Sequence, residues 1–143
     1  IREAVRIIKS HGISMSTYFI LGHPGETRET VKKTQRLAIE LNTKLIAVGV
    51  MVPYPGTRIY EMAKRGEGGY RLLSEDWSHY DKYGGQALEL EGLTYRDLMK
   101  YQKQTLILFY LKNLRLLDAI AYFWERRHSL KYFLLKRLGL IKG

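Results

Sequence analysis

Residues 18–27 read YFILGHPGET, and residues 45–57 read LIAVGVMVPYPGT. Each segment starts with an apolar run typical of a β-strand and then breaks off at a turn rich in Pro and Gly. All three prolines of the chain lie in these two turns. Apolar residues recur at helical spacing after each turn. The sequence therefore predicts two strand–turn–helix units, which build parallel sheets whose ligand sites lie at the C-terminal ends of the strands.

The two units predict an α-β-α-β-α order with right-handed crossovers. Gly12 is well placed to end an opening helix, because glycine readily adopts the left-handed conformation found at many helix ends. Thr27 and Thr57 are expected to cap the helices that follow the two turns. The strands are expected over 13–21 and 45–52, and the second is apolar enough to be covered on both faces.

The rest of the chain divides into two parts of different character. Residues 66–93 are rich in Gly and aromatic side chains, and we expect an ordered segment with little regular structure there. Thr94 then begins a long helix, because Asp97 follows three positions later and can complete a capping box. A break in this helix is expected near Asn113 or Asp118. The predicted parts are two strand–turn–helix units over 1–65, the irregular segment over 66–93 and a basic helical extension over 94–143.

Composition excludes several kinds of site. The chain has 143 residues, 45% of them hydrophobic, which is enough for one domain with a buried core. It has no cysteine, so disulfides, thiolate nucleophiles and cysteine-ligated zinc or iron–sulfur sites within the chain are excluded. No apolar run approaches the roughly 20 residues of a membrane-spanning helix, and we expect a cytoplasmic protein. Because Ile1 already lies in a helical pattern, we also expect a piece of a longer protein.

Positive charge is concentrated in the C-terminal third. Residues 1–95 carry 13 Lys and Arg against 11 Asp and Glu, whereas residues 96–143 carry 11 against three. Over 118–143 the cations alternate with aromatic and aliphatic residues. Helices of this kind can lie on an anionic membrane surface, bind RNA or a partner helix, or cover a core with their apolar face. Among the functional alternatives we favour peripheral membrane contact over nucleic acid.

The first strand and turn resemble a known family. The run from Gly12 to Thr34 is similar to the fifth strand and following helix of radical S-adenosylmethionine (radical SAM) enzymes. In that family the strand carries a loose motif, G-x-I-x-G-x-x-E, whose backbone borders the adenine of the cofactor. Ile20 and Gly22 match its centre. Tyr18 replaces the first glycine of the motif, and Glu26 lies one position later than its acid.

The second turn extends this resemblance. The run VPYPGT over 52–57 is similar to the sixth strand and exit loop of the family, which also lie beside the adenine. The resemblance implies an α/β fold, the last two parallel strands of a partial (β/α)6 TIM-like barrel, followed by the helical extension. It implies no catalytic acid or base and no metal ligand in this chain. The residues implied to contact the adenine side of S-adenosylmethionine are Ile20, Leu21, Gly22, Pro53 and Tyr54.

The absent cysteines limit what this chain can do by itself. Radical SAM enzymes bind a [4Fe–4S] cluster through a C-x-x-x-C-x-x-C loop, which this chain lacks. The resemblance therefore implies that a preceding part of the same protein supplies the cluster and four strands, and that this chain alone is inactive. The run LSEDWSHYD over 73–81 resembles the end of cobalamin-dependent members, which adds cobalamin as a possible cofactor of the full-length protein and leaves open whether a cobalamin domain precedes this chain.

The expected activity of the full-length protein is radical-based methyl transfer, cyclisation or oxidoreduction on a substrate that the sequence does not identify. The alternative is a non-catalytic binding module that uses the basic helices. Other candidate residues have simpler explanations. His23 could donate a proton but reads as a polar loop residue. Asp76, His79 and Asp81 could suggest a metal site, but their spacing fits no standard ligand pattern and favours helix capping and solvated charge. Trp77 and Tyr80 could stack on a substrate or pack an irregular core.

Overall fold

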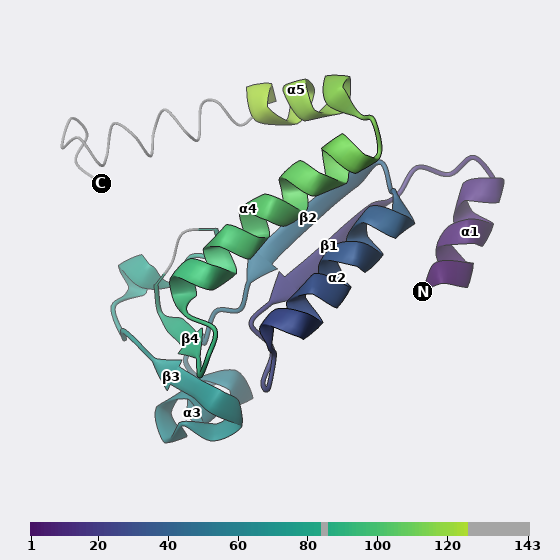
Figure 1. Cartoon of the computed structure of the whole chain (residues 1–143). Helices are drawn as coiled ribbons and strands as arrows, with labels where there is room; N and C mark the ends of the chain where they lie inside the picture. Colours follow the sequence, from purple (N-terminus) through teal and green to yellow (C-terminus); the bar gives the residue numbers. More distant parts are fainter. Residues whose placement is uncertain (84–85, 126–143) are drawn as a thin grey trace. The chain divides into compact units, whose positions relative to one another are not determined.

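The structure, a computed structural model, describes residues 1–83 and 86–125. The chain divides into two compact units, Ile1–Phe109 and Tyr110–Gly143, and each is described by itself. Most of the basic stretch over 118–143, the end of the expected helical extension, lies outside the described residues. The elements are α1 Arg2–Ser10, β1 Ser16–Leu21, α2 Arg28–Leu41, β2 Leu45–Val50, α3 Arg58–Arg65, η1 Glu67–Gly69, β3 Tyr70–Leu72, η2 Trp77–His79, β4 Leu88–Leu90, α4 Tyr95–Lys112 and α5 Leu116–Glu125 (Figure 1).

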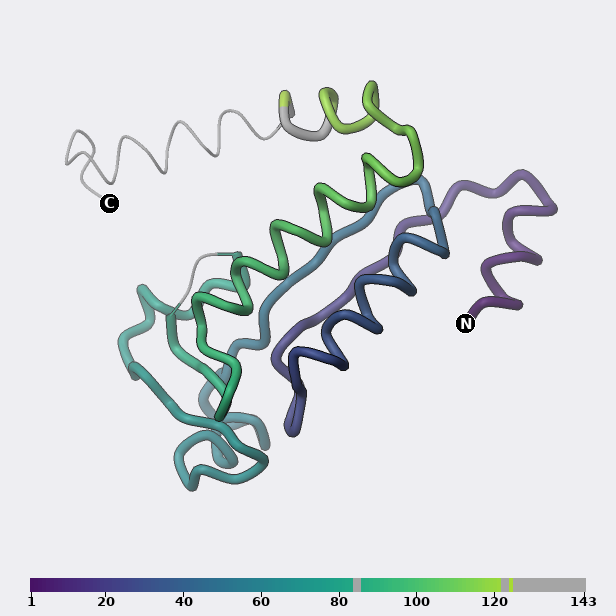
Figure 2. Tube along the Cα trace, viewed as in Figure 1, coloured from purple at the N-terminus to yellow at the C-terminus, as the bar shows by residue number. Residues whose placement is uncertain are grey.

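The two strand–turn–helix units are confirmed. Strands β1 and β2 form a two-stranded parallel sheet, with Ser16 opposite Leu45 at one end and Leu21 opposite Val50 at the other. The Cα trace shows the two strands running side by side in the same direction (Figure 2). Both strands are shorter than predicted: β1 starts three residues later than 13, and β2 ends two residues before 52.

The late start of β1 follows from how α1 ends. The backbone N–H of Gly12 donates to the carbonyl of Lys9 at 3.0 Å, and that of Ile13 donates to the carbonyl of Ile8 at 3.3 Å. With Gly12 at φ +69°, this is a Schellman motif. The motif uses Ile13 to finish the helix, so that residue is not free to pair with a neighbouring strand.

The predicted helix caps are present at the start of both crossover helices. The Thr27 hydroxyl accepts from the Thr30 backbone N–H, and the Thr30 hydroxyl accepts from the Thr27 N–H, which is a complete capping box. The Thr57 hydroxyl accepts from the Tyr60 N–H. Each turn therefore delivers the chain into a well-defined helix N-terminus.

The two faces of the parallel sheet differ. Helices α2 and α4 lie on one face (Figure 1), and their mutual contact includes a 3.1 Å hydrogen bond from Gln35 Nε2 to the Thr105 hydroxyl. Strand residues such as Leu21 and Val48 are buried on that face. On the other face the Tyr18 side chain is 80% exposed, and Leu45 is 46% exposed. The prediction that the second strand is covered on both faces is therefore wrong for the described residues.

Residues 66–93 hold more regular structure than predicted. Strands β3 and β4 form a small antiparallel sheet, with Tyr70 opposite Leu90 and Leu72 opposite Leu88. The pairing continues beyond the strands, since the Leu73 N–H donates to the Ala87 carbonyl at 2.9 Å. Three-residue strands are too short to show the alternation by which strands are recognised in sequence, which explains the missed sheet.

Helix α4 begins as predicted and ends at the first of the two places where a break was expected. The Thr94 hydroxyl accepts from the Asp97 N–H at 3.2 Å, and the Thr94 N–H donates back to the Asp97 carboxylate at 3.2 Å. The helix stops at Lys112, and the break falls near Asn113, one of the two predicted places. Leu114 in this break has φ +54°, a left-handed conformation that interrupts the helix.

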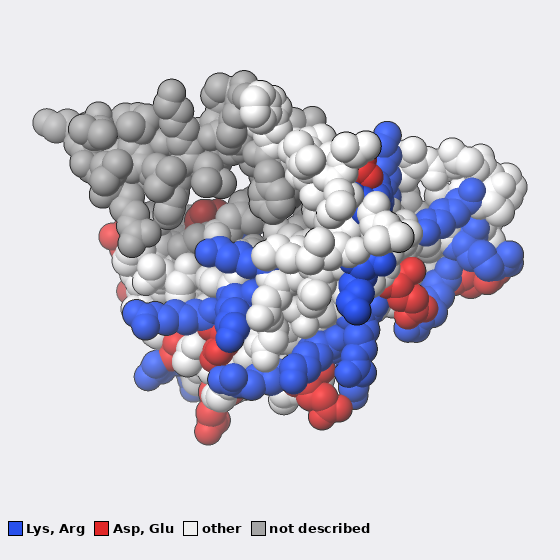
Figure 3. Space-filling model, turned by 45° about the horizontal axis from the view of Figure 1, so that its top comes forward, with Lys and Arg blue, Asp and Glu red and all other residues white. Residues whose placement is uncertain are grey.

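Ion pairs join part of the charged surface of the described residues. On the face drawn in Figure 3, Lys and Arg atoms outnumber Asp and Glu atoms, and acidic atoms lie beside basic ones. Ion pairs such as Lys33–Glu29 at 3.2 Å account for part of this pattern. Across residues 1–83 and 86–125, no helix combines the length and apolarity needed to cross a membrane.

Candidate functional site

The two turns start from adjacent strand ends. The Met51 N–H donates to the Leu21 carbonyl at 2.7 Å, which continues the parallel ladder one residue beyond the strands. Gly22 follows directly at φ +95°, and a Cβ built there would lie 3.3 Å from Met51 Cβ. Glycine is therefore required for both its conformation and its close approach to the second strand. We call residues 20–27 and 51–57 the two-turn site.

The first turn is held by contacts within the chain. The Gly22 N–H donates to the Glu26 carboxylate, and the Gly22 carbonyl accepts from the Tyr70 hydroxyl at 2.8 Å. The Gly25 N–H donates to the Gly68 carbonyl at 3.0 Å. Burial, with a smaller contribution from the negative charge of Glu26, raises the pKa of Tyr70 above its ordinary value, so its hydroxyl stays a donor.

A glycine also sets how closely the first turn packs. Gly68 has φ +64°, and a Cβ at that position would lie 3.0 Å from Pro24 Cβ and 3.2 Å from Met62 Cε. Any side chain at Gly68 would push the first turn away from η1. The turn thus gains rigidity from a segment more than 40 residues later in the sequence.

The second turn is fixed mostly by its own backbone. The Tyr54 carbonyl accepts from the Thr57 N–H at 3.1 Å and from the Thr57 hydroxyl at 2.6 Å. Gly56 supplies a positive φ of 81°. Pro53 is fully buried and stiffens the entry to the turn. The loop conformation is therefore preformed.

Aromatic side chains adjoin the second turn. The Tyr54 and Tyr80 rings lie 6.1 Å apart, and the Trp77 and Tyr80 rings lie 5.4 Å apart, both in tilted arrangements. Tyr80 is buried, and its hydroxyl donates to the Ser74 carbonyl at 3.1 Å. Trp77 is 67% exposed. Tyr80 therefore packs in the core, which was one of the two roles predicted for it. The Trp77 ring is exposed at the surface.

The five residues expected at the cofactor fall into two groups. Ile20 and Tyr54 are 48% and 46% exposed, so each presents an apolar surface that a ligand could contact. Leu21, Gly22 and Pro53 are buried. The buried three can shape the site but do not present side chains to a ligand.

The remaining sequence candidates have local roles or none. His23 is exposed. The Asp76 carboxylate accepts from the Ser78 N–H at 2.8 Å and caps η2, which confirms the capping interpretation. Within the part of the chain that the structure describes, no three His, Asp or Glu side chains gather closely enough to hold a metal ion.

Sequence reasoning missed the residues that support the site from a distance. Tyr70 and Gly68 hold the first turn, and Gln102 of α4 contacts the second strand. For Gln102 a signal exists, because a polar residue four positions after the buried Leu98 falls on the apolar face of the helix. Tyr70 stands in a Gly-rich stretch without periodicity, and nothing in the sequence marks Gly22 as its partner.

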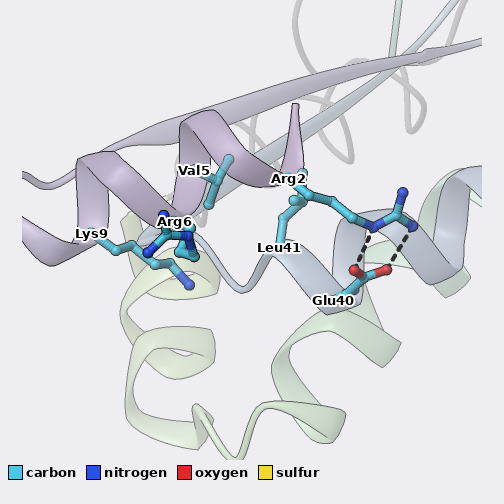
Figure 4. A pocket seen from close by; sticks show the side chains of 6 residues that line it. All are labelled: Arg2, Val5, Arg6, Lys9, Glu40 and Leu41. Atoms are coloured by element: carbon cyan, nitrogen blue, oxygen red, sulfur yellow. Dashed lines mark hydrogen bonds and ion pairs between the residues drawn. The ribbon is translucent and has the colours of Figure 1, made fainter.

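A separate hollow of about 220 Å³ lies between α1 and the end of α2 (Figure 4). The Arg2 guanidinium makes two hydrogen bonds to the Glu40 carboxylate, at 2.5 and 2.8 Å, and these hold the pKa of Glu40 below its usual range. Arg6 is likewise paired with Glu3. The lining is completed by Val5, Lys9 and Leu41, and none of these residues belongs to the two-turn site.

Two curated proteins are similar in sequence to this chain. The chain is 32% identical over 110 residues to a protein of Pyrococcus horikoshii named as an uncharacterized methyltransferase, and the match covers 77% of the chain and 23% of that protein. It is 38% identical over 50 residues to the tRNA-2-methylthio-N(6)-dimethylallyladenosine synthase of a Roseiflexus species, covering 35% of the chain and 10% of that protein. The chain thus spans about a quarter of the first relative and about a tenth of the second. Both names are those of enzymes.

No protein-family model matches the chain, and no solved structure matches it.

Proposed function

We propose that this chain forms the C-terminal part of a radical SAM enzyme, in which the two-turn site packs against the adenine side of S-adenosylmethionine. The observation that carries the proposal is the meeting of both turns at one end of a parallel sheet, with Leu21 and Met51 joined there by a backbone hydrogen bond. Ligand sites of parallel α/β folds lie at this end of the strands. The similarity to a protein named as a methyltransferase, over 77% of the chain, also supports it.

The edges of the parallel sheet support a position at the end of a larger sheet. On the outer edge of β2, the Val50 N–H donates to the Lys82 carbonyl at 3.0 Å, and Gln102 Nε2 donates to the Val48 carbonyl at 2.7 Å. That edge is occupied. Strand β1 pairs only with β2 among the described residues. Preceding strands of a partial barrel would therefore add beside β1.

The backbone of β1 is oriented for such an addition. The Leu21 carbonyl faces β2, and backbone groups alternate in direction along a strand. The N–H and carbonyl groups of Tyr18 and Ile20 therefore face away from β2. An open strand edge with a half-exposed apolar face is normally covered in a folded protein, and a fourth barrel strand would cover it here.

The residues of this chain fit one of the implied cofactors and not the other. A [4Fe–4S] cluster requires cysteine ligands, and the chain has none, so its ligands must belong to another part of the protein. Ile20 and Tyr54 offer apolar surfaces suited to a flat adenine, and Gly22 adds no side chain beside them. S-adenosylmethionine, together with the cluster, would supply the radical or the methyl group. Cobalamin stays an implication of the sequence resemblance.

The chain's own contribution is binding and orientation. Because the Gly22 N–H and carbonyl are engaged by Glu26 and Tyr70, Gly22 would meet the adenine through van der Waals contact. The buried Leu21 and Pro53 would anchor the backbone that carries their exposed neighbours, Ile20 and Tyr54. No group in the two-turn site is proposed to transfer a proton.

The proposal is tested by cofactor binding to the full-length protein, reconstituted with iron and sulfide under anaerobic conditions. We expect Ile20→Asn to raise the dissociation constant for S-adenosylmethionine at least about tenfold. Ile107→Asn is the matched control, because Ile107 of α4 is 49% exposed and lies outside the site. Equal affinities of the two variants, at equal cluster content, would show that the two-turn site does not contact the cofactor.

A further inference from the structure

The layer that helices α2 and α4 form over the parallel sheet is basic on its solvent side. The two helices lie side by side on one face of the sheet (Figure 1), joined by the hydrogen bond from Gln35 to Thr105. Residues 28–41 and 95–104 carry seven Lys and Arg against three Asp and Glu. All seven cations are exposed.

The three acids of this layer are already paired. Glu29 pairs with Lys33 at 3.2 Å, and Asp97 pairs with Arg28 at 2.9 Å. The third acid, Glu40, pairs with a cation of α1. Asp97 also feels a weaker attraction from the neighbouring Lys100. Among residues 1–83 and 86–125, five cations of the layer have no ion pair, and we call them the basic surface: Lys32, Arg36, Arg96, Lys100 and Lys103.

The spacing of these cations gathers them into one patch. Lys32 and Arg36 are four positions apart, so they lie one above the other on the exposed side of α2. Arg96, Lys100 and Lys103 follow at intervals of four and three on the exposed side of α4. The axes of packed helices lie about 8–10 Å apart. The two rows therefore run next to each other along the outside of the layer.

We propose that the basic surface binds the phosphate backbone of a nucleic acid. A nucleic acid carries a dense line of negative charge, one per about 1.7 Å of duplex axis, and cations that neutralise it release condensed counterions. Two neighbouring rows of long, flexible cations can reach successive phosphates. Contacts to phosphates position a nucleic acid without reading its bases, so we expect binding that does not depend on sequence.

The composition of the patch separates this occupant from its competitors. Within residues 28–41 and 95–106 no large apolar side chain is exposed. A lipid surface would therefore gain no apolar burial here, and helices that lie in a membrane interface depend on such burial. A second copy of the chain would bring like charges into contact, which opposes association. The inference does not involve residues 118–143 and does not depend on the proposed radical SAM function.

Fluorescence anisotropy with labelled poly(U) and poly(dT) tests the proposal on the whole 143-residue chain. We expect Lys32→Gln/Arg36→Gln to weaken binding at about 0.1 M salt by at least about tenfold. The slope of log K against log salt should become shallower by about 1.4, because each phosphate contact to a single strand contributes about 0.7. Arg96→Gln/Lys103→Gln should have the same effect.

The matched control removes one Lys and one Arg from other helices. Lys9→Gln/Arg58→Gln changes exposed residues of α1 and α3 and should leave the affinity and the slope nearly unchanged. Equal losses for the control and the Lys32→Gln/Arg36→Gln variant would show that binding follows net charge, and would overturn the proposal. So would failure to bind either polymer, or binding to phosphatidylglycerol vesicles without binding to poly(U).

A change of opposite sign gives a second readout. Glu29→Gln releases Lys33 from its ion pair at the edge of the basic surface and should tighten binding to poly(U) at least about twofold. Glu61→Gln is the control, because Glu61 pairs with Arg65 of α3 at the same spacing of four positions. If Glu29→Gln binds poly(U) no more tightly than Glu61→Gln does, the assignment of this surface is wrong.

Discussion

The hydroxyl of Tyr70 reaches the carbonyl of Gly22, 48 residues earlier in the sequence. Tyr70 is 3% exposed, so this hydrogen bond is shielded from water. A buried carbonyl that loses its donor carries a desolvation penalty. Tyr70 is thus a positioning residue for the first turn, and Glu26 has the same role through the Gly22 N–H.

Replacing Tyr70 by Phe should lower the free energy of unfolding by about 1–2 kcal/mol, since the ring stays buried while the Gly22 carbonyl loses its partner. Urea unfolding of the chain measures the change. Tyr18→Phe is the control, because Tyr18 is 80% exposed and should leave stability unchanged. An unchanged midpoint for Tyr70→Phe would mean that this hydrogen bond does not hold the turn.

The same residue predicts a loss of stability at alkaline pH. Burial and the nearby Glu26 raise the pKa of Tyr70 in the folded chain. Its contribution is fully present below the unfolded pKa of about 10 and is lost as pH rises toward the folded value, because the unfolded tyrosine ionises first. Above about pH 10, the free energy of unfolding should fall more steeply for the natural chain than for Tyr70→Phe. Parallel pH profiles would contradict this assignment.

At the scale of elements, Gln102 joins helix α4 to the outer edge of β2. Its side-chain amide donates to the Val48 carbonyl at 2.7 Å and to the Lys82 carbonyl at 3.1 Å. Gln102 is 4% exposed. One side chain therefore satisfies two backbone acceptors and closes a strand edge that would otherwise be free to pair with another chain.

Gln102→Met should lower the free energy of unfolding by about 1–3 kcal/mol, because the Val48 carbonyl loses its buried donor while side-chain volume is nearly kept. The Lys82 carbonyl keeps the Val50 N–H as a donor. Gln104→Met in the same helix is the matched control, since Gln104 is only half-buried. Guanidinium unfolding compares the two. Equal losses for both variants would rule out a special role of the edge contact.

The sequence predicted the elements whose signals are local. Thr27, Thr57 and Gly12 act on neighbours within a few residues, so their caps could be read directly. The bonds from Tyr70 to Gly22 and from Gln102 to Val48 join residues 48 and 54 positions apart. Such hydrogen bonds depend on how the elements pack, and no local sequence pattern predicts them.

The candidate site was predicted to the same extent. The turns and their adjacency followed from the strand–turn–helix repeat. The repeat did not predict which of the five expected residues are exposed. Ile20 and Tyr54 are exposed and the other three are buried, because exposure depends on which face of the sheet α2 and α4 cover. The open face of β1 was missed for the same reason.

At the scale of the whole molecule, the edge of β1 that faces away from β2 has no strand beside it among residues 1–83 and 86–125. In the isolated chain, the amides of Tyr18 and Ile20 should exchange with deuterium at least about tenfold faster than those of Phe19 and Leu21, which face β2. In the full-length protein, a strand added beside β1 should slow the exchange of Tyr18 and Ile20. Equally fast exchange in both would argue against a preceding strand.

We propose that the two-turn site contacts S-adenosylmethionine in the full-length protein. Hydrogen–deuterium exchange of the anaerobically reconstituted full-length protein, with and without S-adenosylmethionine, tests it most directly. We expect slower exchange on cofactor addition in peptides that cover 18–27 and 51–57, and no change in a peptide that covers 100–109. Unchanged exchange in both turns, under conditions where cofactor binding is measured independently, would contradict the account.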